Sequence, residues 1–363
     1  MKLLLITLGL LVCGISAAVS TIVPHQGRLD KKPIHLRGIY KRTQITEAHS
    51  AELRVIGEFS NYCTGTLIGP RHVLTAAHCV YNHERKEWQN NLDFIPAKVD
   101  SIKIPFGRYE WKRAFAPIQF ISGNIDPSYD YALVELEEPI GEELGWAGVK
   151  SVTDKEFINK VRMTGYPGDK PKGTMWTVTC PAEVQKDKVV YLCDTFAGMS
   201  GSGLFSLNPK DEDIVYIVGV HSYGGLDSNG GASINEERLK TIKSWMNGDV
   251  TNESVKHDNS EIYSYFKLYA KNNCKQAISG YFSLFDFVWG FWSSVGEITL
   301  IPGMRSLVGR TPNTFYYLWA ESYEKTWSDV NFIQTPNGTL PMIESRIQLK
   351  KWGDWTHQFN CSP

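Results

Sequence analysis

A serine in a glycine-rich turn is the first residue of this sequence that could act as a nucleophile. Residues 198–203 read GMSGSG, and the small neighbours of Ser200 leave its hydroxyl exposed. Because glycine tolerates backbone angles that other residues avoid, the backbone N–H groups of such a turn can point toward an oxyanion. Gly-Ser loops are common, so this turn indicates nucleophilic catalysis only together with a base.

His78, in the segment TAAHC, is the candidate base. It precedes Cys79, and Cys63 lies 16 residues before Cys79, so a disulfide across this loop would restrain the imidazole. A lone histidine is usually structural. A histidine on a corner of small residues, beside a cysteine that can be cross-linked, fits a catalytic role better.

A third residue is needed to orient the imidazole, and we expect Asp130 to do this. It opens the apolar run DYALVEL, where a buried carboxylate at the start of a strand needs a partner such as an imidazole N–H. Asp126 is the alternative, but it precedes Pro127 in a turn-like segment that we expect to be exposed.

The chain order His78, Asp130, Ser200 matches chymotrypsin-like proteases and differs from subtilisins and α/β-hydrolases. In such a triad the serine attacks the scissile carbonyl. The histidine takes the serine proton and later gives it to the leaving amine, while the aspartate fixes the tautomer. The backbone N–H groups of Gly198 and Ser200 would form the oxyanion hole.

The elements that position these residues have the pattern of strands. From about residue 43 to 234, short apolar runs alternate with turn residues, as in LRVIGEF, KVVYLC and IVYIVGVHSY, which predicts an all-β barrel or sandwich. In NEERLKTIKSWM, the spacing of Leu239, Ile242 and Met246 predicts a closing helix. A polar linker, TNESVKHDNSE, then leads into an aromatic-rich extension, 251–363, whose fold the sequence leaves unknown.

Residues 1–18 have the layout of a secretory signal peptide. Lys2 precedes an apolar run, LLLITLGLLVCGIS, that is too short to span a bilayer, and small residues follow it. Residues 19–42 are rich in basic residues and proline, and we expect a propeptide with cut sites at Arg37 or Lys41–Arg42. The protein is therefore predicted to be secreted, without a transmembrane anchor.

Loss of Cys13 with the signal peptide leaves six of the 7 cysteines. An even count in a secreted chain favours three disulfides, although the sequence allows several connectivities. Proximity along the chain favours the pairs Cys63–Cys79, Cys180–Cys193 and Cys274–Cys361. Glycosylation on a secretory route is also expected, at the sequons that begin at Asn252, Asn337 and Asn360.

Longer segments carry a family resemblance. TGTLIGPRHVLTAAHCV, DYALVEL, DTFAGMSGSG and IVGVHSYGG resemble the trypsin/chymotrypsin superfamily. TGYPGDKPKGTMW, residues 164–176, resembles the corresponding segment of the bacterial glutamyl endopeptidases, the V-eight-type branch.

This resemblance covers about residues 42–247. It implies a chymotrypsin-like double antiparallel β-barrel, with six strands in each barrel, the site between them and a C-terminal helix. We place this serine protease domain at residues 43–250, and the segment 164–176 should be a strand and surface turn without a chemical role.

The resemblance also implies a substrate pocket. The glutamyl endopeptidase branch cleaves after glutamate, and less readily after aspartate. Its pocket is marked by a histidine on the strand after the nucleophile and by a hydroxyl five residues before it, here His221 and Thr195. Ser222, Tyr223 and Gly224 follow that histidine and are expected at the pocket. Both donors would bind a carboxylate through charge-assisted hydrogen bonds, best where the imidazole is protonated.

Asp194 disagrees with this prediction. It lies six residues before Ser200, where trypsins place the carboxylate that selects Arg or Lys. An acidic pocket would repel glutamate, unless Asp194 is a buried structural acid that points away from the pocket. Cleavage after Arg or Lys therefore stays open as an alternative to cleavage after Glu or Asp.

Activation also departs from the trypsin pattern. Trypsin-type zymogens place an aspartate just before the nucleophile, where it binds the new amino terminus, and this chain has Met199 there. We therefore expect processing near residues 37–42 to supply an amino terminus that acts elsewhere, near the pocket.

Composition and motifs exclude several other functions. The net charge of −1 and the absence of a basic stripe argue against a nucleic-acid partner. No nucleotide or cofactor motif occurs, and histidines such as His72 and His83 lack the spacing of metal ligands, so we expect neither a cofactor nor a metal. The expected partners are protein or peptide substrates.

Two other classes of protein were weighed against a protease. A binding module would keep the barrels and use the extension to hold an unknown partner, but the complete triad disfavours it. Chain order and the lack of alternating helices disfavour an α/β-hydrolase esterase.

Overall fold

The computed structural model describes the chain from Tyr40 to Cys361 with short gaps, and the described residues belong to one compact unit. The expected signal peptide and residues 19–39 of the expected propeptide lie outside them. Among the described helices, none is long and apolar enough to cross a membrane. The described ranges are 40–153, 157–207, 215–225, 227–251, 254–259, 265–286, 291–349 and 353–361.

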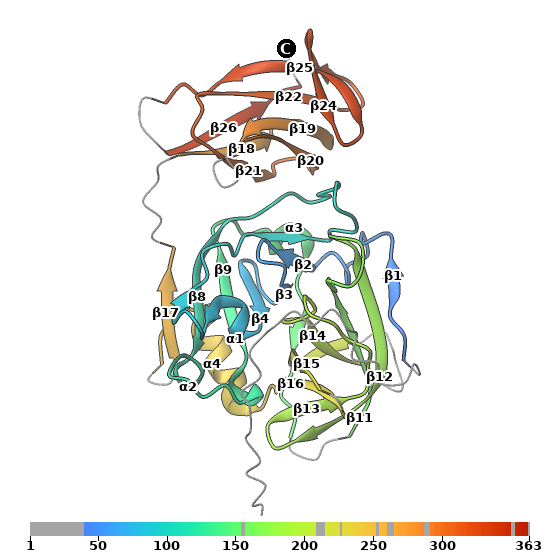
Figure 1. The fold of residues 1–363 in the computed structure, drawn as a ribbon, viewed down its shortest axis with the longest axis vertical. Helices are drawn as coiled ribbons and strands as arrows, with labels where there is room; N and C mark the ends of the chain where they lie inside the picture. The colour runs from blue at the N-terminus through green and yellow to red at the C-terminus, as the bar shows by residue number, and fades with distance from the viewer. Residues whose placement is uncertain are drawn as a thin grey trace, which may run out of the picture. The chain divides into compact units, whose positions relative to one another are not determined.

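Residues 56–136 contain the strands of an antiparallel barrel (Figure 1). Six of the described strands run in the order β8, β9, β4, β3, β2 and β7. The two ends of this series meet where Phe94 and Tyr109 exchange backbone hydrogen bonds of 2.8 Å. The strands are β2 (Ile56–Phe59), β3 (Thr64–Leu67), β4 (His72–Thr75), β7 (Phe94–Pro96), β8 (Trp111–Pro117) and β9 (Ala132–Leu136).

The second barrel is closed, because β12 pairs with both β11 and β13. Buried and exposed side chains alternate along β12 from Val178 to Gln185, as they do in a strand with one face on a core. Two short strands, β1 (Thr43–Ile45) and β10 (Gly148–Val149), pair with β12 and β15 from outside. The barrel strands are β11 (Phe157–Gly165), β12 (Met175–Gln185), β13 (Lys188–Tyr191), β14 (Gly203–Leu207), β15 (Val215–Gly224) and β16 (Asn229–Ser233).

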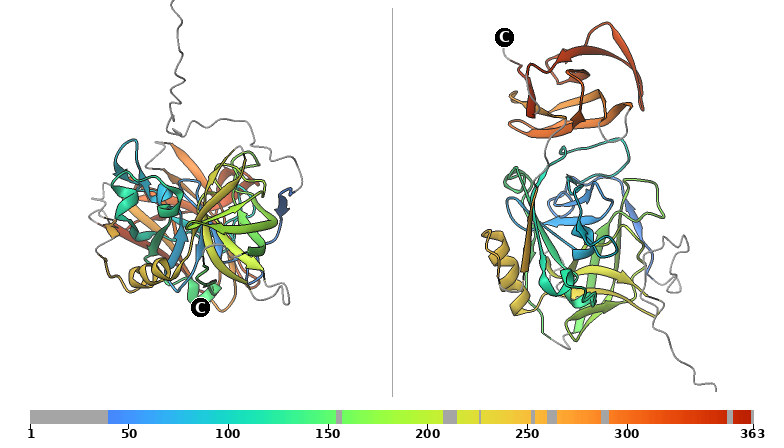
Figure 2. Two further views of the ribbon diagram at one scale, coloured as in Figure 1. Left: turned by 90° about the horizontal axis from the view of Figure 1, so that it is seen from below. Right: turned by 60° about the vertical axis from the view of Figure 1, so that its left-hand side comes forward.

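These two barrels confirm the expected chymotrypsin-like arrangement, and the closing helix is present as α4 (Glu236–Met246). Asn235 caps this helix by accepting a hydrogen bond of 2.9 Å from the backbone N–H of Arg238. The fully buried Trp245 stacks on Phe115 and Tyr131, so α4 follows the second barrel but packs on the first (Figure 2).

Short elements complete the two barrels. They are α1 (Ala77–Val80), α2 (Ile118–Ile121), the 3₁₀ helix η1 (Pro127–Tyr129), α3 (Gly141–Leu144), β5 (Tyr81–Asn82) and β6 (Glu87–Trp88).

The segment after α4 is not the linker that its polar sequence predicted. Residues 254–258 form β17 (Ser254–Asp258), which pairs antiparallel with β8 at the edge of the first barrel. His257 stacks on Trp88 and Trp111, with ring centroids 5.1 and 5.7 Å away. An edge strand can be polar because one side of its backbone and one of its faces remain in water.

The aromatic-rich extension, whose fold the sequence left unknown, is a β-sandwich. Phe282 of one sheet meets Phe359 of the other, with ring centroids 6.2 Å apart. One sheet contains β18 (Phe266–Asn272), β21 (Arg305–Thr311) and β26 (Gly353–Phe359). The other contains β19 (Ile278–Phe285), β20 (Trp292–Leu300), β22 (Phe315–Glu321), β23 (Thr326–Trp327), β24 (Asn331–Thr335) and β25 (Gly338–Arg346).

The β-sandwich and the first barrel share a buried ionic cluster. Lys267 and Glu110, which are 2% and 4% exposed, form an ion pair, and the Tyr269 hydroxyl donates to the same carboxylate at 2.5 Å. Arg310 pairs with Asp93 at 2.8 Å. Charged side chains are this deeply buried only when they are paired. Each of these pairs has one partner in the extension and one in the first barrel, so the pairs join the two.

Three disulfides lie within the described ranges and confirm the pairing that chain proximity favoured. The first closes a loop in the first barrel, the second joins β12 to the segment before Asp194, and the third lies in the β-sandwich. The pairs are Cys63–Cys79, Cys180–Cys193 and Cys274–Cys361.

Candidate active site

His78 and Asp130 lie in hydrogen-bonding contact. Since β4 and β9 pair, α1 after β4 lies beside the turn before β9. Nδ1 of His78 is 2.7 Å from Oδ2 of Asp130, and the backbone N–H of His78 donates to Oδ1 at 2.9 Å. Asp130 is 7% exposed, whereas 36% of the His78 side chain is exposed. The acid is therefore buried behind an imidazole that a substrate can reach.

The carboxylate of Asp130 sets the pKa of His78. Burial lowers the pKa of the imidazole, but the charge and hydrogen bond of Asp130 outweigh burial and leave the pKa above its usual value. A carboxylate that accepts a hydrogen bond from Nδ1–H leaves Nε2 as the atom that can take a second proton.

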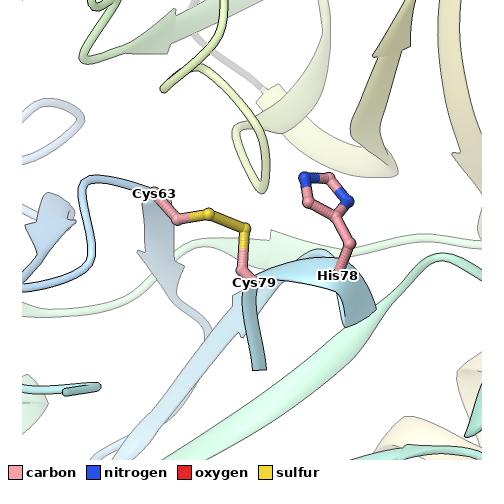
Figure 3. Close-up of side chains that lie close together, drawn as sticks. All are labelled: Cys63, His78 and Cys79. Atoms are coloured by element: carbon pink, nitrogen blue, oxygen red, sulfur yellow. A yellow bond between two sulfur atoms is a disulfide. The ribbon is translucent and has the colours of Figure 1, made fainter. Parts of the chain in front are cut away.

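The disulfide Cys63–Cys79 lies directly beside His78 (Figure 3). The Nδ1 or Nε2 atom of His78 and the two sulfur atoms lie within 4.8 Å of one another, a spacing that a metal site also has. Both sulfurs are bonded to each other, so no thiolate is free to bind an ion. The cluster restrains the position of the histidine.

The loop that carries Ser200 is joined to the same part of the first barrel. The backbone carbonyl of Ser200 accepts a hydrogen bond of 2.8 Å from the N–H of Thr64, and it lies 3.7 Å from Sγ of Cys79. On its other side, the N–H of Gly201 donates to the carbonyl of His221 at 2.8 Å. These contacts bring Ser200 to the side of the first barrel where His78 lies.

Two glycines give this loop a shape that other residues resist. Gly198 has φ +100°, and Gly201 has φ +86°. A Cβ atom at Gly198 would lie 2.3 Å from the carbonyl oxygen of Tyr166, and a Cβ at Gly201 would lie 2.1 Å from that of Thr64. Both glycines are therefore required for the loop to approach its neighbours this closely.

The peptide groups of the loop are oriented by Thr64. Its hydroxyl donates to the carbonyl of Gly198 at 2.8 Å and accepts from the N–H of Tyr166 at 3.1 Å. Among the residues that the structure describes, the N–H groups of Gly198 and Ser200 have no protein acceptor. Two such donors in one tight loop can bind an anionic oxygen.

His221 lies on β15 and is 3% exposed. Its Nδ1 is 2.6 Å from the Tyr191 hydroxyl and 3.2 Å from the carbonyl oxygen of Gly230. Burial lowers the pKa of His221 to about 4, more than the Gly230 carbonyl raises it. The free imidazole is therefore neutral near pH 7, and the stronger binding of acidic substrates to a protonated His221 stays a prediction.

Thr195 is 4% exposed and lies in the segment between β13 and the nucleophile. The side chain of Asn229 donates to the carbonyl of Cys193 at 2.6 Å and so joins this segment to β16. Because β16 pairs with β15, the segment of Thr195 lies near the strand of His221.

The three residues after His221 have different surroundings. The Ser222 hydroxyl is buried and has no hydrogen-bond partner within the described ranges, at the point where β15 bulges between His221 and Tyr223. The Tyr223 hydroxyl lies 2.5 Å from where a Cβ of Gly230 would be, so that glycine leaves room for the ring. Gly224 ends β15.

Asp194 forms an ion pair with Arg42. Nε of Arg42 donates to Oδ2 of Asp194 at 2.9 Å, and its terminal nitrogens donate to Asp169. Met199, just before the nucleophile, is fully buried and offers no acid to an amino terminus.

Asp126, the alternative third member, lies in a different environment from Asp130. Its carboxylate accepts a hydrogen bond of 2.9 Å from the N–H of Ser128 and caps η1. It also pairs with Lys188 at 3.3 Å, and 43% of its side chain is exposed. Asp126 therefore has a capping role.

Four residues at the site were not predicted from the sequence. Three of them form a hydrogen bond with a predicted residue, and Asp169 binds Arg42. These partners lie far away in the sequence, so no short motif indicates the contact. A hint existed only for Asp169, which is part of the segment TGYPGDKP. The four residues are Arg42, Thr64, Asp169 and Tyr191.

Comparison with known proteins identifies a family for the part of the chain that carries this site. The trypsin family model matches residues 37–246, a range that contains both barrels and α4. The match ends before β17 and the β-sandwich.

Two relatives and one solved structure are similar to the barrel region. The chain is 33% identical over 217 residues to the glutamyl endopeptidase of Bacillus licheniformis, which covers 57% of this chain and 67% of the relative. It is 29% identical over 227 residues to the extracellular metalloprotease of Bacillus subtilis, covering 60% of this chain and 71% of the relative. A structure of a Glu endopeptidase in complex with MPD matches with a TM-score of 0.50 and 26% identity, covering 57% of this chain and 97% of that one.

Proposed function

The chain belongs to the trypsin family of serine proteases, and we propose that it is a secreted endopeptidase that cleaves after glutamate or aspartate through His78, Asp130 and Ser200. The observation that carries the proposal is the contact between His78 and Asp130 beside the glycine-rich loop of Ser200. Each residue then has one role in the reaction.

Ser200 is the nucleophile and His78 the general base. As the Ser200 Oγ–H bond breaks, the proton moves to Nε2 of His78 and the oxygen bonds to the carbonyl carbon of the substrate. Asp130 accepts the Nδ1–H hydrogen bond and stabilises the imidazolium that forms. When the tetrahedral intermediate collapses, His78 gives the proton to the amine that leaves. Water then repeats the two steps on the acyl-enzyme and releases the new carboxyl group.

The N–H groups of Gly198 and Ser200 bind the oxyanion of the intermediate. The bond from Thr64 to the carbonyl of Gly198 supports this role, because it fixes the loop before substrate arrives. Donors that are already oriented need no reorganisation during the reaction, and each is typically worth about 10²–10³ in turnover.

His221 and Thr195 bind the carboxylate of the substrate side chain. The buried Tyr191 hydroxyl, whose pKa burial raises well above its usual value, stays protonated and donates to Nδ1 of His221. The hydroxyl is the nearer partner of Nδ1, at 2.6 Å against 3.2 Å for the Gly230 carbonyl, so we assign the proton of the neutral imidazole to Nε2, where it can donate to glutamate. The pocket then recognises a carboxylate by hydrogen bonds rather than by a histidine cation.

Secretion is part of the proposal. Residues 1–18 have the layout of a signal peptide, and the Bacillus subtilis relative is named as extracellular. Three disulfides in the described residues fit an oxidising compartment.

The cleavage pattern of the purified protein tests this function. The protein is incubated with a proteome-derived peptide mixture, and the cuts are read by mass spectrometry, with Ser200→Ala as the control. We expect cuts after Glu and Asp that disappear in the variant. Cuts after Lys or Arg would overturn the specificity and keep the triad. If no cut depends on Ser200, the chain is a binding module that retains the protease fold.

A further inference from the structure

Arg42 joins two carboxylates at the edge of the second barrel. Its Nε donates to Oδ2 of Asp194 at 2.9 Å, and its two terminal nitrogens donate to the two oxygens of Asp169, each at 2.7 Å. Only 3% of the Arg42 side chain is exposed. Two parallel bonds to one carboxylate fix the plane of the guanidinium, so the bond to Asp194 also has a fixed direction.

Both carboxylates belong to segments that build the pocket. Asp194 directly precedes Thr195. Asp169 follows Gly168, whose N–H donates to the carbonyl of Ala197, in the loop of the nucleophile, at 2.8 Å. The guanidinium therefore joins the N-terminal segment, the turn TGYPGDKP and the nucleophile loop. We had expected no chemical role for that turn.

Arg42 binds one of the two carboxylate oxygens of Asp194. Oδ2 is bonded to the guanidinium, and Oδ1 is buried without a hydrogen-bond partner among the described residues. A free carboxylate six residues before the nucleophile would attract Lys and Arg side chains, as in trypsins. An arginine stays charged at every working pH, so its ion pair with Asp194 persists across that range.

We propose that Arg42 determines specificity as a positioning residue: it holds Asp194 in an ion pair, so that this carboxylate does not select basic side chains in the pocket. The inference rests on the proposed function, in which His221 and Thr195 bind the substrate carboxylate. Asp169 contributes by fixing Arg42. Burial raises the pKa of Asp169, but the hydrogen bonds of Arg42 outweigh burial and keep the carboxyl ionised.

This role requires Arg42 to remain in the mature enzyme. The carbonyl of Tyr40 accepts a hydrogen bond of 3.3 Å from the N–H of Asp194, and Thr43–Ile45 pairs with β12, so the chain is part of the barrel from Tyr40 onward. A cut after Arg42 would separate the guanidinium from the barrel. Of the two basic sites that the sequence offers, only the one at Arg37 keeps Arg42.

Two double variants of equal charge test the inference. Arg42, Asp169 and Asp194 together carry a charge of −1, and each variant keeps that sum. R42Q/D169N leaves Asp194 without its cation, whereas R42Q/D194N removes Asp194. We measure kcat/KM on three peptides that differ only in Glu, Gln or Lys before the scissile bond. R42Q/D169N should raise the Lys-to-Gln ratio and lower the Glu-to-Gln ratio, each about tenfold. R42Q/D194N should keep the wild-type ratios.

A control pair joins β11 of the second barrel to the turn before β2. Arg162 and Glu52 form a 2.6 Å ion pair, so R162Q/E52Q should leave all ratios unchanged. If R42Q/D169N lowers all three rates equally, Arg42 is only structural and the inference is wrong. If the wild type prefers Lys, Asp194 selects the substrate despite Arg42, which overturns the inference but keeps the serine protease. Loss of the Glu preference in both variants alike would also overturn it.

The amino terminus of the secreted protein gives a readout that does not depend on activity. Edman sequencing or mass spectrometry should find a mature chain that begins before Tyr40. A fully processed chain that begins at Thr43 would overturn the inference, whatever the peptides show. Absence of any Ser200-dependent cleavage, with Arg42 retained, would instead sink the proposed function.

Discussion

At the scale of single residues, catalysis requires His78 to be neutral in the free enzyme. The pKa of His78 is lowered by burial and raised more strongly by Asp130, so it lies above the usual value for histidine. A general base must be unprotonated to accept a proton. Activity is therefore expected to be present above the raised pKa and lost as the pH falls through it.

Asp130→Asn tests this dependence. The change keeps the shape of the side chain and removes its charge, so the pKa of His78 should fall and the acid limb of the pH–rate profile should move to lower pH. Turnover should fall about 10⁴-fold, because the amide no longer holds the required tautomer. Both effects are read from kcat/KM on one peptide between pH 4 and 9.

Asp126→Asn is the matched control for that experiment. Asp126 caps η1 and pairs with Lys188, so its loss should leave the pH profile and turnover unchanged. A D130N enzyme with the wild-type profile, or a D126N enzyme with the larger loss, would contradict the assignment of Asp130.

The sequence predicted those residues that carry a local signature. His78 and Ser200 lie in short motifs, and Asp130 begins an apolar run, so a segment of a few residues was enough to identify each of them. Arg42 could not be found in this way. Its partners lie 127 and 152 residues away, and only the fold brings them together. The lowered pKa of His221 likewise depends on burial, which no motif records.

At the scale of elements, the loop before Ser200 works because its glycines accept a backbone that other residues resist. Gly198 combines a left-handed φ with close contact to the carbonyl of Tyr166, whereas Gly145 has a similar φ of +79° and nothing within 4 Å. The two positions therefore separate the effect of backbone strain from the effect of contact.

Gly198→Ala should destabilise the protein and disable the oxyanion loop. The added Cβ cannot stay 2.3 Å from the Tyr166 oxygen, so the loop must shift, and turnover should fall about 10²–10³-fold. Gly145→Ala should cost about 1–3 kcal/mol of unfolding free energy, because Gly145 combines φ +79° with ψ −175°, and it should leave turnover unchanged. Denaturant unfolding and peptide kinetics on both variants measure this, and equal turnover in the two variants would argue against an oxyanion role for the loop.

The sequence predicted whether a segment is a strand or a helix better than it predicted which sheet each strand belongs to. Alternating apolar runs indicated the strands, and helical spacing indicated α4, because these periods are local properties of the chain. β17 was missed since an edge strand needs no apolar pattern. The sheet order of the extension, including the parallel pair β18 and β26, depends on contacts between segments about 87 residues apart, which periodicity does not reveal.

At the scale of the whole molecule, stability is shared between the first barrel and the β-sandwich. The ion pair between Glu110 and Lys267 is almost fully buried, and the hydroxyl of Tyr269 adds a further hydrogen bond to the same carboxylate. A buried pair of this kind adds little beyond apolar residues of the same size, but removal of Lys267 leaves the buried Glu110 carboxylate with only the Tyr269 hydroxyl and a 3.5 Å contact to Arg310.

Lys267→Met should therefore destabilise the protein by about 3–5 kcal/mol, whereas the double variant E110Q/K267M should be markedly less destabilised. Lys256→Met, which breaks an exposed pair with Asp258, serves as the control and should cost under about 1 kcal/mol. Thermal and denaturant unfolding measure all three variants. A K267M protein as stable as K256M would show that the cluster does not join the two parts.

The disulfide Cys274–Cys361 also governs how the extension would respond to a pull. Tension applied beyond Cys361 passes through the sulfur bridge to Cys274, at the end of the first strand of the sandwich, and bypasses the strands between them. The 87-residue span between the two cysteines stores about 300 Å of contour length that no force can draw out while the bridge is intact. A reductant, rather than load, therefore decides whether the span between Cys274 and Cys361 can be extended.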